Sequence, residues 1–248
     1  MPLAFYRVAG RLAGLAVLFC MGCAGLSVQP SPQPPAIEAV GDGLGWWYVR
    51  FQSAWVENQD PAWQNDPMLA REVIRPVLAE YEDEIVLWRF HRRAARDNSG
   101  HQFSFIFYAT QETADRINRT VRSAVLVEKL TRSGILIRVR YDNPASIKRP
   151  DIEDTSDKKW SEPLQRTWPF FIMGVSRTWL ELIETFAVQN GDESGPVSLA
   201  DLQARYAEIN RQINQTWKLE GNHAYFHHLS ALFGYRPVVV LEKRLMTF

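Results

Sequence analysis

The sequence predicts an α+β protein. It should contain a ferredoxin-like β-α-β-β-α-β unit, with a four-stranded antiparallel sheet and two helices on one face, followed by a mainly helical C-terminal half. Two observations support this prediction. Four segments rich in aromatic and β-branched residues alternate with the two-residue period of strands. Apolar residues three and four positions apart, the spacing typical of helices, lie between the first and second strands and between the third and fourth. The same spacing dominates the chain after residue 150.

The four strands are expected at 46–55, 84–93, 101–108 and 134–141, and a turn at 97–100 joins the second to the third. The aromatic residues of this hairpin share one face and are expected in the core: Trp88, Phe90, Phe103, Phe105 and Phe107. The same parity directs Arg89, His91 and Arg93 away from the core.

The two helices of this unit have recognisable beginnings. Asp66 is predicted to cap the first helix, with Pro67 at its first position and a kink at Pro76. Thr110 is predicted to cap the second helix, which extends to Val125.

The region 150–248 is predicted to be helical and to pack on the sheet. A charged linker at 150–159 precedes a helix that begins at Pro169. Its apolar face is expected to comprise Phe171, Val175, Trp179, Leu182, Ile183 and Phe186. Ser198 and Asp201 resemble a capping box that begins the next helix.

The C-terminal end is predicted to hold one more helix and a short strand. Gly221 should end the preceding helix, Asn222 should cap the last one, and Gly234 should close it. The residues 237–243 have the composition of a last strand.

The first 22 residues have the composition of an export signal. Arg7 and Arg11 supply a positive segment, and the apolar run at 12–19 is too short to span a bilayer. Gly22 then directly precedes Cys23. Taken alone, this pattern also fits an ordinary secretory leader or an N-terminal anchor.

This order of segments resembles the bacterial lipoprotein signal, in which the cysteine is lipidated and becomes the first residue of the mature chain. The resemblance implies a signal peptide at 1–22 and a lipid on Cys23 that holds the protein on a membrane. Because Ala24 follows the cysteine, it implies the outer membrane of the cell envelope, with the protein facing the periplasm. The Pro- and Gly-rich residues 23–45 then form a tether, and the domains follow at 46–149 and 150–248.

Composition excludes several classes of function. Without the leader, 26 basic and 28 acidic residues remain, a net charge of −2, which argues against a nucleic-acid partner. Cys20 and Cys23 are the only cysteines, so the body has no disulfide, no cysteine nucleophile and no cysteine-ligated metal.

The candidate binding site is the basic hairpin: Arg89, His91, Arg92, Arg93 and His101. Guanidinium and imidazole groups on one face could bind an anionic group such as a phosphate or a carboxylate. The alternative is a solvated sheet face without a ligand.

The other three histidines lie together near the C-terminus. His223 and His227 are four residues apart on one face of the predicted helix, and His228 lies about 100° further round. A zinc site needs a third ligand, so no metal and no cofactor are predicted.

The body of the chain resembles the C-terminal, elimination-type domain of lanthipeptide and thiopeptide dehydratases. The similarity involves the Trp-rich opening strand, the segments WRFHRR and GHQFSF, SRTWLELI at 176–183, and the closing helices. Ser104 and Ile106 stand where the family carries arginines. The resemblance implies the architecture, and if the activity were retained it would implicate Arg89, His91 and His101.

Two hypotheses follow from the sequence. In the first, the chain is a non-catalytic periplasmic lipoprotein whose basic hairpin binds a protein or an anionic envelope component. In the second, it is an enzyme related to the peptide-modifying elimination domains. The second requires Arg89, His91 and His101 to converge.

Overall fold

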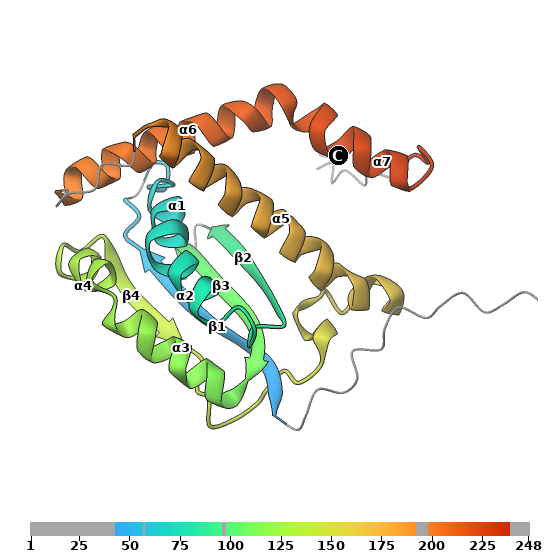
Figure 1. Cartoon of the computed structure of the whole chain (residues 1–248), viewed down its shortest axis with the longest axis horizontal. Helices are drawn as coiled ribbons and strands as arrows, with labels where there is room; N and C mark the ends of the chain where they lie inside the picture. The colour runs from blue at the N-terminus through green and yellow to red at the C-terminus, as the bar shows by residue number, and fades with distance from the viewer. Residues whose placement is uncertain (1–42, 57, 96–97, 192–197, 239–248) are drawn as a thin grey trace, which may run out of the picture. The chain divides into compact units, whose positions relative to one another are not determined.

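A four-stranded antiparallel sheet lies at the centre of the fold (Figure 1). The computed structural model describes residues 43–56, 58–95, 98–191 and 198–238. Within them the chain forms an α+β fold, as predicted. The predicted signal peptide, Cys23 and nearly all of the tether lie outside the described residues.

The strands are β1 (Leu44–Ser53), β2 (Leu87–Ala94), β3 (His101–Thr110) and β4 (Leu136–Tyr141), in the order β2-β3-β1-β4. Every neighbouring pair is antiparallel. β1 begins before the predicted start at Trp46 because Leu44 and Gly45 already pair with Thr110 and Ala109. β2 begins later than predicted because Glu84 and Ile85 donate backbone hydrogen bonds to Tyr81 in a turn.

The predicted strand parity of the hairpin is confirmed. Phe90 pairs with Phe105, and Phe105 pairs with Val49 on β1, so one face of the sheet is a continuous apolar layer. The hairpin aromatics on this face are all buried: Trp88, Phe90, Phe103, Phe105 and Phe107.

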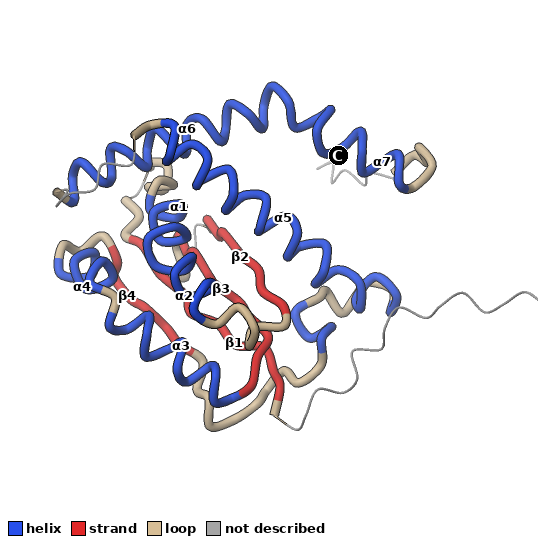
Figure 2. The backbone as a smooth tube through the Cα atoms, viewed as in Figure 1, coloured by secondary structure: helices blue, strands red, loops and turns tan. Residues whose placement is uncertain are grey.

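Helical segments cover this apolar face (Figure 2). The first comprises α1 (Asn65–Leu69), the π-helical η1 (Ala70–Ile74) and α2 (Arg75–Glu80); the second comprises α3 (Gln111–Ser123) and α4 (Val125–Arg132). Thr110 caps α3 as predicted, since its hydroxyl accepts a hydrogen bond from the Thr113 N–H at 3.1 Å. The predicted single helix is divided at Ala124, whose backbone is extended.

One prediction about the first helical segment is wrong. Gln64, and not Asp66, is the N-cap residue, because the Asp66 carboxylate is directed toward side chains of the sheet. Near Pro76, where a kink was predicted, the π-helical η1 directly precedes α2. Proline cannot donate to the carbonyl four residues earlier, and a wider turn accommodates its ring.

The helix predicted to begin at Pro169 begins earlier: α5 spans Glu162–Gln189, after the short 3₁₀ helix η2 (Ile152–Thr155). Pro169 therefore lies inside the helix and leaves the Gln165 carbonyl without its usual donor. The Ser156 hydroxyl donates to that carbonyl at 2.6 Å. This contact offsets the lost backbone hydrogen bond and permits proline within α5.

The helix α5 runs alongside β2 at one edge of the sheet (Figure 1). The Phe90 N–H donates to the Ser176 hydroxyl at 3.0 Å, so α5 satisfies part of the backbone at this edge. The buried residues of α5 are Pro169, Ser176, Leu180, Ile183 and Ala187. The predicted face was therefore partly wrong, because Phe171 and Val175 are exposed.

The helix α6 (Leu199–Gly221) begins as predicted, with the Ser198 hydroxyl accepting from the Asp201 N–H. Tyr206 and Ile209 on α6 belong to the same buried cluster as the sheet residues, so the helical half and the sheet share one core.

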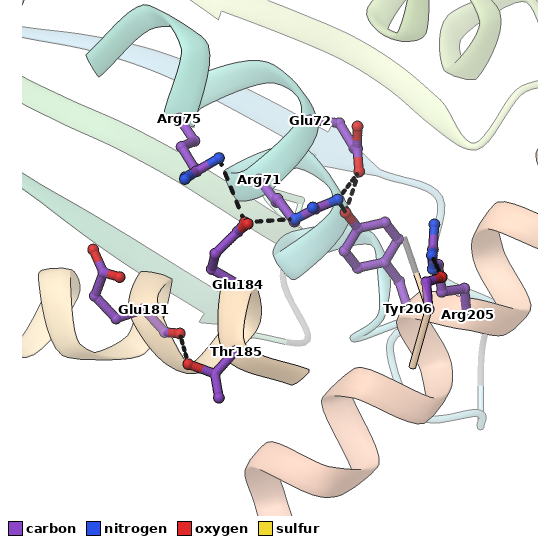
Figure 3. A network of polar contacts seen from close by, with 9 residues as sticks. Arg71, Glu72, Arg75, Glu181, Glu184, Thr185, Arg205 and Tyr206 are labelled. Carbon is purple, nitrogen blue, oxygen red and sulfur yellow. Dashed lines mark hydrogen bonds and ion pairs between the residues drawn. The ribbon is translucent and has the colours of Figure 1, made fainter. Parts of the chain in front are cut away.

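A polar network connects η1 with α5 and α6 (Figure 3). Arg71 donates to Glu184 at 2.7 Å and to Glu72 at 2.9 Å, and the Tyr206 hydroxyl donates to Glu72. Burial, reinforced by the hydrogen bond to Glu72, raises the pKa of Tyr206 well above its usual value. The Tyr206 phenol donates to Glu72 and accepts from Arg71, so it joins both residues of η1 to α6.

The predicted break at Gly221 is wrong. Its backbone is right-handed, and the chain continues through the π-helical η3 (Asn222–His227) into α7 (His228–Leu232). Gly234 has a φ of +65° and lies just beyond the end of α7, as predicted. The predicted strand at 237–243 lies almost entirely outside the described residues. Among the described helices, none combines the length and apolarity needed to cross a membrane.

At Gly45, β1 packs closely against residues 147–149, and this packing leaves no room for a side chain. A Cβ atom at this position would lie 2.7 Å from the Ile147 Cγ2 and 3.3 Å from the Arg149 carbonyl oxygen. We expect Gly45→Ala to lower the free energy of unfolding by about 1–3 kcal/mol through overpacking. Urea denaturation measures the change. In the control Gly174→Ala, where the added Cβ meets no atom within 4 Å, stability should not fall.

Candidate functional site

The face of the sheet opposite the helices carries rows of basic and polar side chains. Cross-strand pairing places His91, Ser104, Arg50 and Arg140 in one row that crosses all four strands. The adjacent row comprises Arg93, Gln102, Gln52 and Arg138. We define the basic face as Arg50, Arg89, His91, Arg93, Arg138 and Arg140.

Three arginines of the basic face are close enough to His91 to act on its pKa. Desolvation, and then the positive charges of Arg89, Arg50 and Arg93, lower the pKa of His91 below its ordinary value. His91, Arg138 and Arg140 are exposed, whereas Arg50 and Arg89 are half-buried. Such a concentration of positive charge favours an anionic ligand.

One end of the same sheet face is covered by residues 150–155 and the beginning of α5, which we call the wall. The Trp46 indole donates to the carbonyl of Asp151 at 3.0 Å, and the Tyr108 hydroxyl donates to the carbonyl of Pro150 at 2.6 Å. Arg89 lies beside the wall, with its guanidinium carbon 4.9 Å from the ring centroid of Trp168. Burial, and then the charge of Arg149, lowers the pKa of Arg89 to about 10.

Two of the five predicted binding residues lie on the opposite, helix-covered face. Arg92 pairs with Phe103, and His101 occupies the same apolar layer, so neither shares a face with Arg89, His91 and Arg93. The prediction that all five form one site is therefore wrong. Alternation along β2 separates Arg92 from its neighbours, and register places His101 opposite Ala94.

Arg92 and His101 instead form a buried network with Asp66. The Asp66 carboxylate accepts from the Arg92 Nε at 2.7 Å and contacts the His101 Nε2 at 2.8 Å, and the side chains of Asp66 and His101 are 0% exposed. Trp63 lies against both partners, 4.9 Å from the Arg92 guanidinium carbon and 4.9 Å from the imidazole centroid. This network connects α1 with the sheet.

Ser53 lies next to this network, because it is the cross-strand partner of His101. Among the described residues, neither the Ser53 Oγ nor the His101 Nδ1 has a hydrogen-bond partner. The Ser53 hydroxyl therefore makes no hydrogen bond to the imidazole, and the three groups do not form the hydrogen-bonded chain of a nucleophilic triad. Ser53 is also only 1% exposed, so a substrate has no access to the hydroxyl, and the contacts of Asp66 with Arg92 and His101 hold α1 on the sheet.

The three C-terminal histidines are closer than predicted. The π-helical turn η3 brings the rings of His223, His227 and His228 within 5.2–5.4 Å of one another, measured between centroids. A π-helix has more residues per turn than an α-helix, so His228 rotates toward the other two. No group of three or more potential ligands within the described ranges is arranged to hold a metal ion.

Arg50, Arg138 and Arg140 were not among the predicted binding residues. Their alternation within the first and fourth strands was visible in the sequence, and it predicts an outward direction. Their position in the same rows as His91 and Arg93 depends on strand order, because β1 lies between β3 and β4. Strand order is a long-range property that the alternation of a single strand does not contain.

Comparison of the chain with protein-family models, with characterised proteins and with solved structures finds no match in any of the three.

Proposed function

We propose that this chain is a membrane-anchored periplasmic lipoprotein, held by a lipid on Cys23, that binds an anionic component of the cell envelope through the basic face. The main support is the row His91–Ser104–Arg50–Arg140, in which two guanidinium groups, an imidazole and a hydroxyl share one sheet face. Guanidinium groups form charge-assisted hydrogen bonds with phosphate and carboxylate oxygens. The proposal retains the sequence-based location and corrects the set of residues.

We also propose that the sheet and its covering helices form a ferredoxin-like unit. The element order β-α-β-β-α-β and the strand order β2-β3-β1-β4 support this assignment. In such a unit the helices cover one face and leave the other for ligands or partners. That arrangement agrees with the position of the basic face.

Binding is favoured over catalysis by the positions of three side chains. The enzyme hypothesis requires Arg89, His91 and His101 to converge. His101 lies on the helix-covered face and is fully buried, whereas His91 lies on the other face and is exposed. The intervening sheet separates the two imidazoles, so they cannot act on one substrate atom.

Lipid anchoring is tested by Cys23→Ser. We expect the wild-type protein in the membrane fraction of its bacterial host and the variant in the soluble fraction, because removing the thiol removes the site of lipidation. Immunoblotting of the two fractions measures the distribution, and Cys20→Ser is the matched control. If Cys23→Ser remains in the membrane fraction with its leader uncleaved, the lipoprotein assignment is wrong.

Anion binding is expected to depend on pH through His91. A bound anion offsets the positive charges that lower the pKa of His91, so the pKa should be higher in the complex. The contribution of protonated His91 to anion affinity is therefore complete below the pKa of His91 in the free protein. It is lost as pH rises through the pKa of His91 in the complex. Each unit by which the ligand raises this pKa contributes about a tenfold change in affinity.

Sulfate is a suitable probe because its own charge does not change over the pH range in which His91 titrates. Isothermal titration calorimetry should show tighter sulfate binding at the acidic end for the wild-type protein and a flatter pH profile for His91→Gln. A pH dependence that is the same in both proteins would assign the effect to another group.

A further inference from the structure

The two edges of the sheet differ in what covers them. At β2, the helix α5 runs alongside the strand, and the Phe90 N–H donates to the Ser176 hydroxyl at 3.0 Å. The strand β4 forms the other edge, away from α5 (Figure 1). In the described part of the chain, β4 pairs with β1 alone. One side of β4 is therefore without a neighbouring strand.

The register of β4 with β1 shows which peptide groups are directed to this open side. The Asp142 N–H donates to the Tyr48 carbonyl at 3.1 Å, and peptide groups in an antiparallel pair alternate between the two sides of a strand. Val139 and Tyr141 therefore direct their N–H and carbonyl groups away from β1. No other backbone segment within the described ranges pairs with these groups. Such a row of backbone donors and acceptors is a template for a further strand.

The side chains of β4 leave this edge accessible and give it a positive charge. Ile137 is 61% exposed, and Arg138 and Arg140 are exposed as well. The two arginines lie on the basic face, and Val139 between them lies on the helix-covered face. A strand added beside β4 would therefore meet two guanidinium groups on one face and apolar side chains on the other.

A second copy of this chain does not match the edge. If Val139 pairs antiparallel with Val139 of the other copy, alternation places Arg138 opposite Arg140. If Val139 pairs with Tyr141 of the other copy, Arg140 lies opposite Arg140. Like charges directly opposite each other destabilise a strand pair. The same positions favour a strand that carries negative side chains, because opposite charges across a strand pair stabilise it.

We propose that β4 binds an extended segment of a partner protein as a fifth, antiparallel strand, and that this segment carries acidic residues at alternate positions. Backbone hydrogen bonds to Val139 and Tyr141 supply affinity, and contacts of the acidic side chains with Arg138 and Arg140 supply specificity. Antiparallel pairing matches the other pairs of the sheet. The inference rests on the proposed function, because both arginines belong to the basic face, and it names the class of partner.

The probe is the capped, fluorescein-labelled peptide Thr-Val-Glu-Val-Glu-Val-Thr, titrated with the complete protein and followed by fluorescence anisotropy. With the glutamates opposite Arg138 and Arg140, the central valine lies opposite Val139 and its N–H is directed to β4. The N–H groups of the glutamates are directed away from the protein. We expect N-methylation of the central valine to weaken binding by roughly tenfold or more, and N-methylation of a glutamate to leave it nearly unchanged.

The contribution of charge is tested separately. The variant Arg138→Ala/Arg140→Ala should bind the peptide roughly tenfold more weakly, and so should the wild type with lysines in place of both glutamates. Arg119→Ala/Arg132→Ala is the matched control, because both residues are exposed on α3 and α4 and the change in charge is the same. It should bind the peptide like the wild type. Circular dichroism spectra establish that both double variants are folded.

Several results would overturn the inference. The same response to both N-methylated peptides would exclude strand addition, and equal affinity for the lysine peptide would exclude acidic recognition. Unchanged affinity of the Arg138→Ala/Arg140→Ala variant would place the peptide elsewhere, and a dimer that the peptide dissociates would identify a second copy as the occupant. Sulfate titration of the same protein separates the two proposals. Saturable sulfate binding without peptide binding removes only the partner strand, whereas absence of sulfate binding contradicts the proposed function itself.

Discussion

Replacing Asp66 by Asn is expected to lower the free energy of unfolding by about 3–5 kcal/mol, because it breaks a buried ion pair and leaves charge without compensation. Asp66 is fully buried between the Arg92 guanidinium and the His101 imidazole. Asparagine has almost the same shape but no charge, so the effect comes from the lost ionic hydrogen bonds. Because the Arg92 side chain is 26% exposed, water partly solvates its guanidinium, and we expect the loss of stability at the lower end of this range.

Chemical denaturation monitored by tryptophan fluorescence measures this change. The matched control is Asp115→Asn, since Asp115 forms an exposed ion pair with Arg119 on α3. An exposed pair of this kind contributes about 0–1 kcal/mol, so the control should remain close to the wild type. If Asp66→Asn is no more destabilising than the control, Asp66 does not hold α1 on the sheet.

Replacing Arg50 by Glu is expected to have the largest effect on anion binding. Arg50 lies in the row between Ser104 and Arg140, and its charge acts on His91. The substitution removes a charge-assisted hydrogen bond and introduces like-charge repulsion toward the ligand. We expect the affinity for sulfate to fall by about ten- to hundredfold.

The stability of this variant should change little, because the new carboxylate is surrounded by the other arginines of the basic face. Calorimetry measures the affinity, and Arg119→Glu on the helix-covered side provides a control with the same change in charge. Unchanged sulfate affinity in a folded Arg50→Glu variant would exclude the central row as the anion site.

The secondary structure of the sheet could be predicted because its signals are local. Alternation in the hairpin assigns Phe103, Phe105 and Phe107 to the core and Arg89 to the other face, and the register confirms both assignments. The caps at Thr110 and Ser198 were also local patterns, and the structure confirms both.

The failures come from interactions between residues distant in the sequence. Asp66 has the sequence pattern of a helix cap, but its ion pair with Arg92 connects positions 26 residues apart. Pro169 has the pattern of a helix start, but Ser156 supplies a donor for the carbonyl that proline leaves free. No local rule contains either contact.

The candidate site was predicted only in part, because local patterns indicate the face of one strand but not its neighbours in the sheet. Parity within one strand correctly grouped Arg89, His91 and Arg93. The sequence-based site also included Arg92 and His101, because closeness along the hairpin was taken as closeness in space. Arg50 and Arg140 were missed because only the strand order β2-β3-β1-β4 places them in the same row as His91 and Ser104.

The most direct test of anion binding at the basic face is a titration of the ¹⁵N-labelled protein with sulfate, followed by NMR at each assigned amide. Saturable shifts are expected in the row of His91, Ser104, Arg50 and Arg140, and none at Arg119 or Arg132 on the covering helices. If the row shows no saturable shift, or if the shifts are spread over all exposed arginines, the basic face is not an anion-binding site.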